Sequence, residues 1–200
     1  SEAWGVEIPS TFPRMTHREA MDRFGSDKPD TRYPQEILNV GDIFASTEFK
    51  VFRGALDSGG VVRALNVKGL AKITTGQIEE LTQMAKQYGA KGLAFIKCEN
   101  GEWKSPIVKF FSEAEKKALQ ERLNIEEGDL VLFGADRRDT VCEVLGRVRL
   151  RVVEILGIKH DPQRLDFLWV VDFPLLAWSE EEQKLNAVHH PFTRPKAEDI

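Results

Sequence analysis

The sequence predicts an α+β fold in which helices pack on a mixed or antiparallel sheet. Apolar residues recur at helical spacing in some segments, whereas short apolar runs bounded by turn residues indicate strands in others. These segments alternate irregularly, with hairpins as well as crossovers, and no repeat of fixed period is present. A doubly wound parallel sheet is therefore disfavoured, and a solenoid is excluded.

Three of the predicted helices begin at capping boxes, in which Thr or Ser is followed three residues later by Glu or Gln. The boxes are Thr16–Glu19, Thr74–Gln77 and Ser112–Glu115. The first helix is expected to end at Gly25 and the second at Gly89, because glycine readily adopts the left-handed conformation that closes a helix. The third is expected to end near residue 123.

A fourth helix is predicted from about Asp139 to Gly157, where seven apolar residues recur at helical spacing. Five arginines lie on or beside it: Arg137, Arg138, Arg147, Arg149 and Arg151. They could form a phosphate-binding stripe. The stronger interpretation is an ordinary solvated helix face, because acidic residues are interleaved with the arginines.

Extended segments occupy much of the remainder. Lys50–Ala55 and Val61–Val67 are predicted to form a hairpin across a turn at residues 57–60. Leu93–Lys97 and Asp129–Phe133 follow as single strands. Phe167–Asp172 is apolar enough to be covered on both faces, and it is predicted to pair in antiparallel fashion with an extended segment near Leu185–His190.

Composition excludes several classes of protein. The 200 residues are 42% hydrophobic and 30% charged, which is typical of a globular domain rather than a disordered chain. A net charge of −4 argues against a free-standing nucleic-acid binder. The longest apolar run, Phe167–Val171, is too short to cross a membrane, and Cys98 and Cys142 are expected to be reduced thiols in a cytosol-like compartment.

Two short segments carry candidate ligand-binding residues. His189 and His190 precede Pro191, which favours an extended backbone, so at most one imidazole can face a given cleft. They could contact a ligand or be structural, and no nearby cysteine supports a zinc site. Lys28, in a loop over Gly25–Pro34, could contact an anion or pair with a neighbouring aspartate.

Several ordered segments together resemble the bacterial and mitochondrial type of aspartyl-tRNA synthetase. The order and spacing match from about Phe12 to the C-terminus. The segments are Phe12-Pro13-Arg14-Met15-Thr16, Phe24-Gly25-Ser26-Asp27-Lys28-Pro29-Asp30, Tyr88-Gly89-Ala90-Lys91-Gly92-Leu93, Ser105-Pro106, Phe133-Gly134-Ala135-Asp136, Trp169-Val170-Val171-Asp172-Phe173-Pro174 and His189-His190-Pro191-Phe192-Thr193.

The resemblance implies a division into three parts. Residues 49–156 would be the α+β insertion known as the GAD domain, which this family shares with an amidotransferase subunit. Residues 1–48 and 157–200 would be flanking pieces of a class II catalytic domain, the latter providing strands of its antiparallel sheet.

It also implies an activity. Such an enzyme activates L-aspartate with ATP and Mg²⁺ to aspartyl-adenylate and then transfers the aspartyl group to tRNA(Asp). It would be a cytoplasmic homodimer with no membrane partner. The motif containing His189 and His190 would bind the aspartate, with His189 as first choice, because imidazole N–H groups can hold a carboxylate.

Two family features are absent from the 200 residues: an arginine-bearing second motif and a glycine-rich third motif ending in arginine. Because these supply the charges that hold ATP, the segment alone is expected to be inactive and to bind no cofactor or metal by itself. The alternative is a free-standing GAD-type module that binds RNA or protein without catalysis. A third possibility is that the insertion only restrains the catalytic domain.

Overall fold

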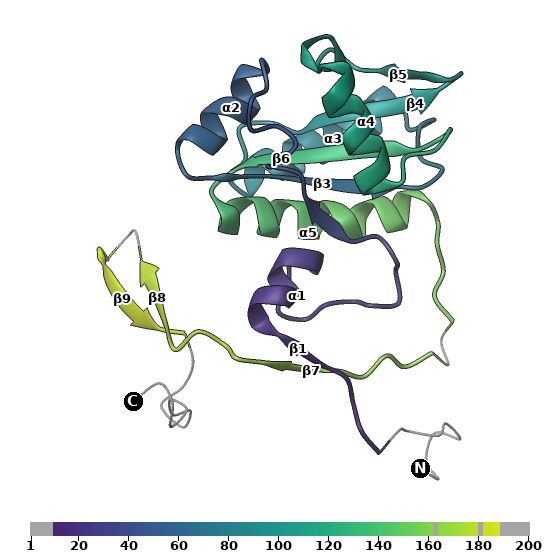
Figure 1. Ribbon diagram of the computed structural model, residues 1–200. Coiled ribbons are helices and arrows are strands. Elements are labelled where there is room, and N and C mark those ends of the chain that lie inside the picture. Colours follow the sequence, from purple (N-terminus) through teal and green to yellow (C-terminus); the bar gives the residue numbers. More distant parts are fainter. Residues whose placement is uncertain (1–9, 162–163, 180–181, 189–200) are drawn as a thin grey trace.

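The computed structural model describes residues 10–161, 164–179 and 182–188. Its centre is a five-stranded sheet in which every neighbouring pair is antiparallel (Figure 1). The strand order is β2 (Ile37–Asn39), β3 (Val61–Val67), β6 (Leu130–Asp136), β4 (Ala94–Glu99) and β5 (Glu102–Lys104). The predicted α+β class is therefore confirmed, with an antiparallel central sheet.

Helices cover both faces of this sheet. α3 (Thr75–Gln87) and α5 (Arg138–Ile155) pack on one face, whereas α2 (Lys50–Asp57) and α4 (Glu113–Leu123) pack on the other, beside the short 3₁₀ helix η1 (Val108–Phe110). Alternate residues of β6 serve the two cores: Leu132 joins the cluster under α3 and α5, and Phe133 joins the cluster under α2 and α4. β6 is thus buried on both faces, which explains its continuous apolar sequence.

The helices that begin at predicted caps form as expected. Thr74 and Ser112 make complete capping boxes at α3 and α4. Thr16 caps α1 (His17–Phe24) by accepting from the Glu19 amide at 3.1 Å, but the Glu19 carboxylate pairs with Arg23 instead of closing the box. α5 follows the predicted apolar period closely.

The predicted hairpin between Lys50–Ala55 and Val61–Val67 is wrong, because the first segment is helix α2. Phe49, Phe52 and Leu56 are spaced three and four residues apart, so a helix places all three against one core. The Phe52 ring lies within 5.5 Å of those of Phe44, Phe49 and Phe133, measured between centroids. This aromatic packing outweighs the strand preference of the short apolar run.

A second, smaller unit lies beyond α5. It contains β1 (Arg14–Thr16), helix α1, β7 (Trp169–Val171) and a hairpin of β8 (Leu176–Ser179) with β9 (Lys184–Ala187). β1 pairs with β7 in parallel.

The predicted pairing of Phe167–Asp172 with Leu185–His190 is wrong, because β7 pairs with β1 and β9 pairs with β8. The short β8–β9 connection costs less closure entropy than a longer one. The prediction that Phe167–Asp172 is covered on both faces is also wrong, because Trp169 is 59% exposed in this chain.

The predicted boundary at residue 49 does not coincide with the start of the sheet. β2 already pairs with β3, and Val40 and Phe44 are fully buried in the core beneath α2. Residues 37–48 therefore pack with the central sheet, while the division into 1–48, 49–156 and 157–200 stays a prediction.

Both cysteines are free and buried. Burial raises the pKa of the Cys98 thiol to about 11 and also raises that of Cys142, so both stay protonated at neutral pH. None of the described helices is long and apolar enough to span a membrane.

Asp129 ties the start of β6 to the loop after β3. Its carboxylate accepts from Asn66 at 3.0 Å, from the Glu126 amide at 2.9 Å and from the Gly69 amide at 3.2 Å, and it lies 3.0 Å from the Lys68 ammonium. Burial raises the pKa of Asp129, but these donors outweigh it and the pKa lies below its ordinary value.

We expect Asp129→Asn to lower the free energy of unfolding by about 1–3 kcal/mol at pH 7. A depressed carboxyl pKa contributes stability that is present above the unfolded pKa, near 3.9, and is lost as pH falls through the folded pKa. The difference between wild type and variant should therefore shrink on acidification. Urea unfolding at several pH values checks this, with exposed Asp57→Asn as control; a difference that does not change with pH would contradict it.

Candidate functional site

The structure brings two loops together beside the smaller unit. Residues Lys28–Arg32, which follow α1, face Arg164–Phe167, which precede β7, across an open cleft of about 320 Å³. Thr31 donates to Asp166 across the cleft at 3.2 Å. Tyr33 and His160 are joined by a 3.3 Å hydrogen bond nearby. The two flanks of the chain therefore meet at this cleft.

Two arginine–aspartate pairs line the cleft. Arg32 donates to both Asp30 oxygens at 2.9 and 2.7 Å, and Arg164 donates to both Asp166 oxygens at 2.9 and 2.8 Å. These bonds lower the pKa of Asp30 and of Asp166, so both carboxylates are ionised at neutral pH. The charges of these pairs largely compensate one another.

Lys28 adds an uncompensated positive charge. Its backbone amide donates to Ser26 at 3.0 Å, but no carboxylate in the described part of the chain forms an ion pair with its ammonium. Asp30 pairs with Arg32 instead, so the sequence alternative in which Lys28 pairs with Asp27 or Asp30 is not realised. Lys28 is thus a cation available to an anionic ligand.

His189 and His190 lie outside the described residues. The last described strand before them is β9, and Val188 donates its amide to the Leu175 carbonyl at 3.0 Å at the open end of the β8–β9 hairpin. The predicted ligand role of the two histidines stays a prediction.

Arg149 of α5 holds the loop that forms the cleft. The residue is 1% exposed, and its guanidinium donates to the carbonyls of Asp30 and Tyr33, both at 2.7 Å, and to that of Gln35. Burial lowers the pKa of Arg149, while Asp30 and Glu36 act in the opposite direction. A single side chain of the central fold therefore binds three carbonyls of the loop.

Helices α1 and α5 touch through backbone atoms above this loop. A Cβ added at Gly146 would lie 2.5 Å from the Gly25 carbonyl oxygen, and one added at Gly25 would lie 2.1 Å from the Cys142 carbonyl oxygen. Gly25 also has φ +66°, which favours glycine. Sequence analysis did not single out Gly146. A glycine in mid-helix could have indicated the close approach, because it costs about 1 kcal/mol relative to alanine and is usually kept for a packing reason.

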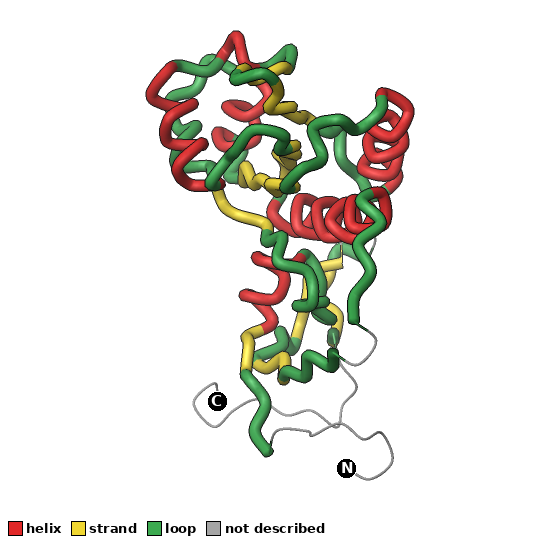
Figure 2. Tube along the Cα trace, turned by 90° about the vertical axis from the view of Figure 1, so that its right-hand side faces the viewer, coloured by secondary structure: helices red, strands yellow, loops and turns green. Residues whose placement is uncertain are grey.

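A part-buried ion cluster joins the smaller unit to the central fold, and Figure 2 shows the backbones of the two, one below the other. Asp22 of α1 accepts from Arg63 of β3 at 2.5 Å and lies 2.7 Å from an Arg138 nitrogen of α5. Arg63 also donates to the Asp22 carbonyl at 2.8 Å. The cluster joins the sheet, α5 and α1, and sequence analysis did not identify it.

The arginine stripe considered from the sequence is largely engaged within the protein. Arg147 stacks on Tyr88 at 3.7 Å and pairs with Glu143 at 3.0 Å, while Arg151 pairs with Glu80 at 2.6 Å. With Arg138 and Arg149, four of the five arginines therefore bind described protein groups. This favours a structural interpretation of the stripe over a phosphate-binding one.

The described residues do not gather a metal site. No group of three or more His, Cys, Asp or Glu side chains in residues 10–161, 164–179 and 182–188 could hold an ion. Lys28 is the group at the cleft whose charge no described carboxylate pairs, so an anion could bind beside it.

We expect Arg149→Met to lower the free energy of unfolding by about 2–4 kcal/mol, because three buried carbonyls lose their donor. Arg147→Met, on the exposed face of the same helix, should cost about 0.5 kcal/mol. Arg149→Lys should lower the free energy of unfolding by an intermediate amount, because an ammonium group cannot reproduce the planar set of donors of the guanidinium. Urea unfolding compares the three; equal losses at 147 and 149 would contradict the anchoring role.

Comparison with known proteins finds similarity to one family model. The model of the GAD domain matches residues 52–145, which run from within α2 to the middle of α5 and include every strand of the central sheet except β2. A hypothetical protein from Pyrococcus horikoshii OT3 aligns with 53% of this chain and 63% of its own at 19% identity, but its TM-score of 0.35 supports no argument.

Curated relatives match the flanks as well. The aspartate–tRNA(Asp/Asn) ligase of Opitutus terrae is 50% identical over 97% of the chain, and that of Aquifex aeolicus is 45% identical over 100%. The aspartate–tRNA ligase of Shouchella clausii is 46% identical over 100%. The chain spans 33–34% of the length of these relatives. It is therefore similar to a GAD-containing segment of these aspartate–tRNA ligases.

Proposed function

We propose that this chain works within an aspartate–tRNA ligase that activates L-aspartate with ATP and transfers the aspartyl group to tRNA(Asp). The observation that carries the proposal is the 44–50% identity to such ligases over nearly the whole chain, flanks included. A free-standing GAD module would need similarity only over residues 52–145. We also propose that the parent enzyme is cytoplasmic and forms a homodimer.

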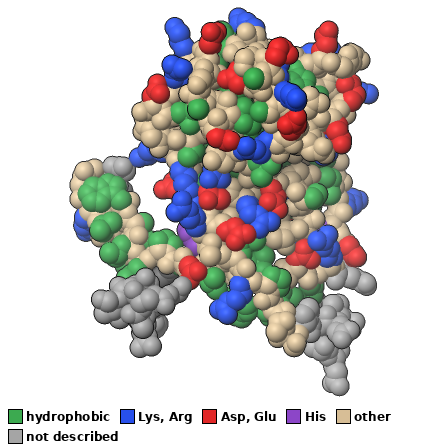
Figure 3. Space-filling model, in the orientation of Figure 1, with side chains coloured by type: hydrophobic (Ala, Val, Ile, Leu, Met, Phe, Trp, Pro, Cys, Tyr) green, Lys and Arg blue, Asp and Glu red, His purple; other side chains and the backbone are tan. Residues whose placement is uncertain are grey.

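The exposed apolar surface of the smaller unit supports this proposal. Trp169, Trp178 and Leu185 are each more than half exposed, and Figure 3 shows apolar side chains gathered on the projecting β8–β9 hairpin. Single domains seldom leave large apolar side chains clustered on their surface. Strands of this kind fit a larger catalytic sheet that would cover them.

Within that enzyme we assign the aspartate contact to His189 first, with His190 as the neighbouring candidate in the same motif. An imidazole N–H can donate to a carboxylate oxygen, and the protonated ring adds charge attraction. Mg²⁺ would accompany ATP in the parent enzyme.

In the full-length enzyme, we expect His189→Ala to raise the aspartate KM by about 10-fold or more and to leave the ATP KM unchanged. The reason is that a hydrogen bond to a charged group contributes about 1.5–3 kcal/mol. Aspartate-dependent ATP–pyrophosphate exchange measures both constants. His160→Ala, which removes a described histidine bonded to Tyr33, is the control. An unchanged aspartate KM in His189→Ala would remove this residue from the site.

The 200-residue chain alone is expected to give no ATP–pyrophosphate exchange above blank, because it contains neither arginine-bearing motif that would hold ATP. The same assay checks this, with the 200-residue chain at a concentration at which exchange by the full-length enzyme has reached its maximum. Exchange by the chain alone would show that the triphosphate contacts lie within these residues.

A further inference from the structure

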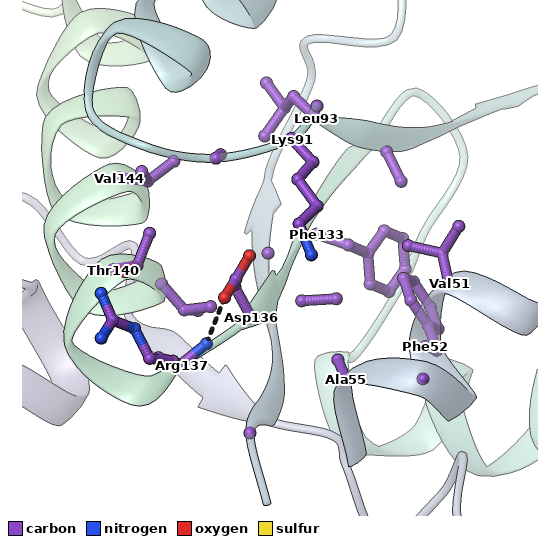
Figure 4. A pocket seen from close by; sticks show the side chains of 18 of the residues that line it. Val51, Phe52, Ala55, Lys91, Leu93, Phe133, Asp136, Arg137, Thr140 and Val144 are labelled. Atoms are coloured by element: carbon purple, nitrogen blue, oxygen red, sulfur yellow. Dashed lines mark hydrogen bonds between the residues drawn. The ribbon is translucent and has the colours of Figure 1, made fainter. Parts of the chain in front are cut away.

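The GAD-type sheet has an open slot at the end of β6. A cavity of about 620 Å³ lies between α2, the loop of residues 90–93, the last residues of β6 and the first two turns of α5 (Figure 4). A carbon added at Gly54 or at Gly92, which both line it, would meet no atom within 4 Å. We call this cavity the β6 slot.

Strand pairing leaves a backbone edge facing the slot. The Val40 amide donates to the Val62 carbonyl, so the backbone groups of Val62 point toward β2. In an antiparallel pair, the residue opposite, Ala135, must then point its own N–H and C=O away from β3. That direction leads to the β4 side of the sheet.

β4 does not reach Ala135. Its ladder with β6 ends at the pair of Ala94 with Phe133, and the chain before Ala94 turns away as loop. Outside the sheet ladders, no backbone hydrogen bond in the described part of the chain involves Ala135. The N–H and C=O of Ala135 therefore face the slot, where they could pair with a residue of one more strand.

The walls of the slot are apolar on both sides of the sheet plane. Phe49 packs against the core under α2 and Ala90 packs against the core under α5, and both line the slot while remaining partly exposed. Side chains of an extended peptide alternate between the two faces of a sheet. A strand lying in the slot would thus place apolar side chains against both walls.

The charges at the slot are mainly positive. Lys50 and Lys91 line it together with one acid, Asp136, whose carboxylate accepts from the Arg137 amide at 2.7 Å. Lys50 and Lys91 are exposed and form no ion pair with any described residue. Figure 4 shows the Lys91 side chain reaching from the loop into the slot. Acidic groups on a ligand would be attracted to this rim.

We propose that the β6 slot binds an extended segment of a partner protein by strand addition, with about three apolar residues in the slot and acidic residues beside them. The central residue pairs with Ala135 through two backbone hydrogen bonds, as a continuation of β4. This proposal is independent of the aspartate-activating role of the flanks. A nucleic acid would not supply alternating apolar groups to the two walls.

The test uses the peptide acetyl-Glu-Val-Ile-Val-Glu-amide, titrated into the ¹⁵N-labelled 200-residue chain. We expect the Ala135 amide resonance to shift and its hydrogen exchange to slow. Methylating the central Ile nitrogen should weaken binding about 10-fold, because it removes the donor to Ala135. Methylating one Val nitrogen, which points away from β6, is the matched control and should have a smaller effect.

Charge reversal distinguishes binding in the β6 slot from nonspecific electrostatic attraction between peptide and protein. Lys91→Glu should weaken binding of the same peptide about 5-fold or more, whereas Lys72→Glu, an exposed lysine away from the slot, should leave it nearly unchanged. The proposal is overturned if about 1 mM peptide leaves Ala135 unperturbed, or if both methylated peptides bind equally. It is also overturned if oligouridylate, and not the peptide, perturbs the slot.

Discussion

The buried guanidinium of Arg149 is the interaction on which the arrangement of the chain depends. It projects from α5, the helix that closes one face of the central sheet, and satisfies three carbonyls of the loop over residues 30–35. An arginine can do this because its planar donors are fixed relative to one another and stay charged when buried. The central fold thereby sets the position of a loop that lines the cleft between the two flanks.

The rest of the junction follows from that placement. Gly25 and Gly146 allow α1 and α5 to meet at backbone distance, which side chains would prevent. Asp22 then lies close enough to Arg63 and Arg138 to pair with both. Because close backbone packing and paired charges reinforce each other, α5 is expected to connect the central sheet and the smaller unit as one rigid element.

Sequence reasoning succeeded where the signal was local. The caps at Thr74 and Ser112 act within one turn of their own helices, and the apolar period of α5 reflects a single buried face. It failed at Lys50–Asp57, where packing against Phe44 and Phe133 overrode a short strand-like run. It also misjudged Arg149, because five arginines near one helix look alike until their neighbours are known. The cleft residues Arg164 and Asp166 carried no distinguishing motif.

The sequence by itself determined the fold class, the bounds of most helices and, through ordered segments on both flanks, the family. Only the tertiary structure decided which arginine is buried, that β7 pairs with β1, and that the Ala135 edge stays open beyond β4. The reason is physical. Caps and periods are set by residues a few positions apart, whereas Arg149 and its carbonyl partners are separated by 114 to 119 positions. Burial and strand pairing at that range depend on the whole packed chain.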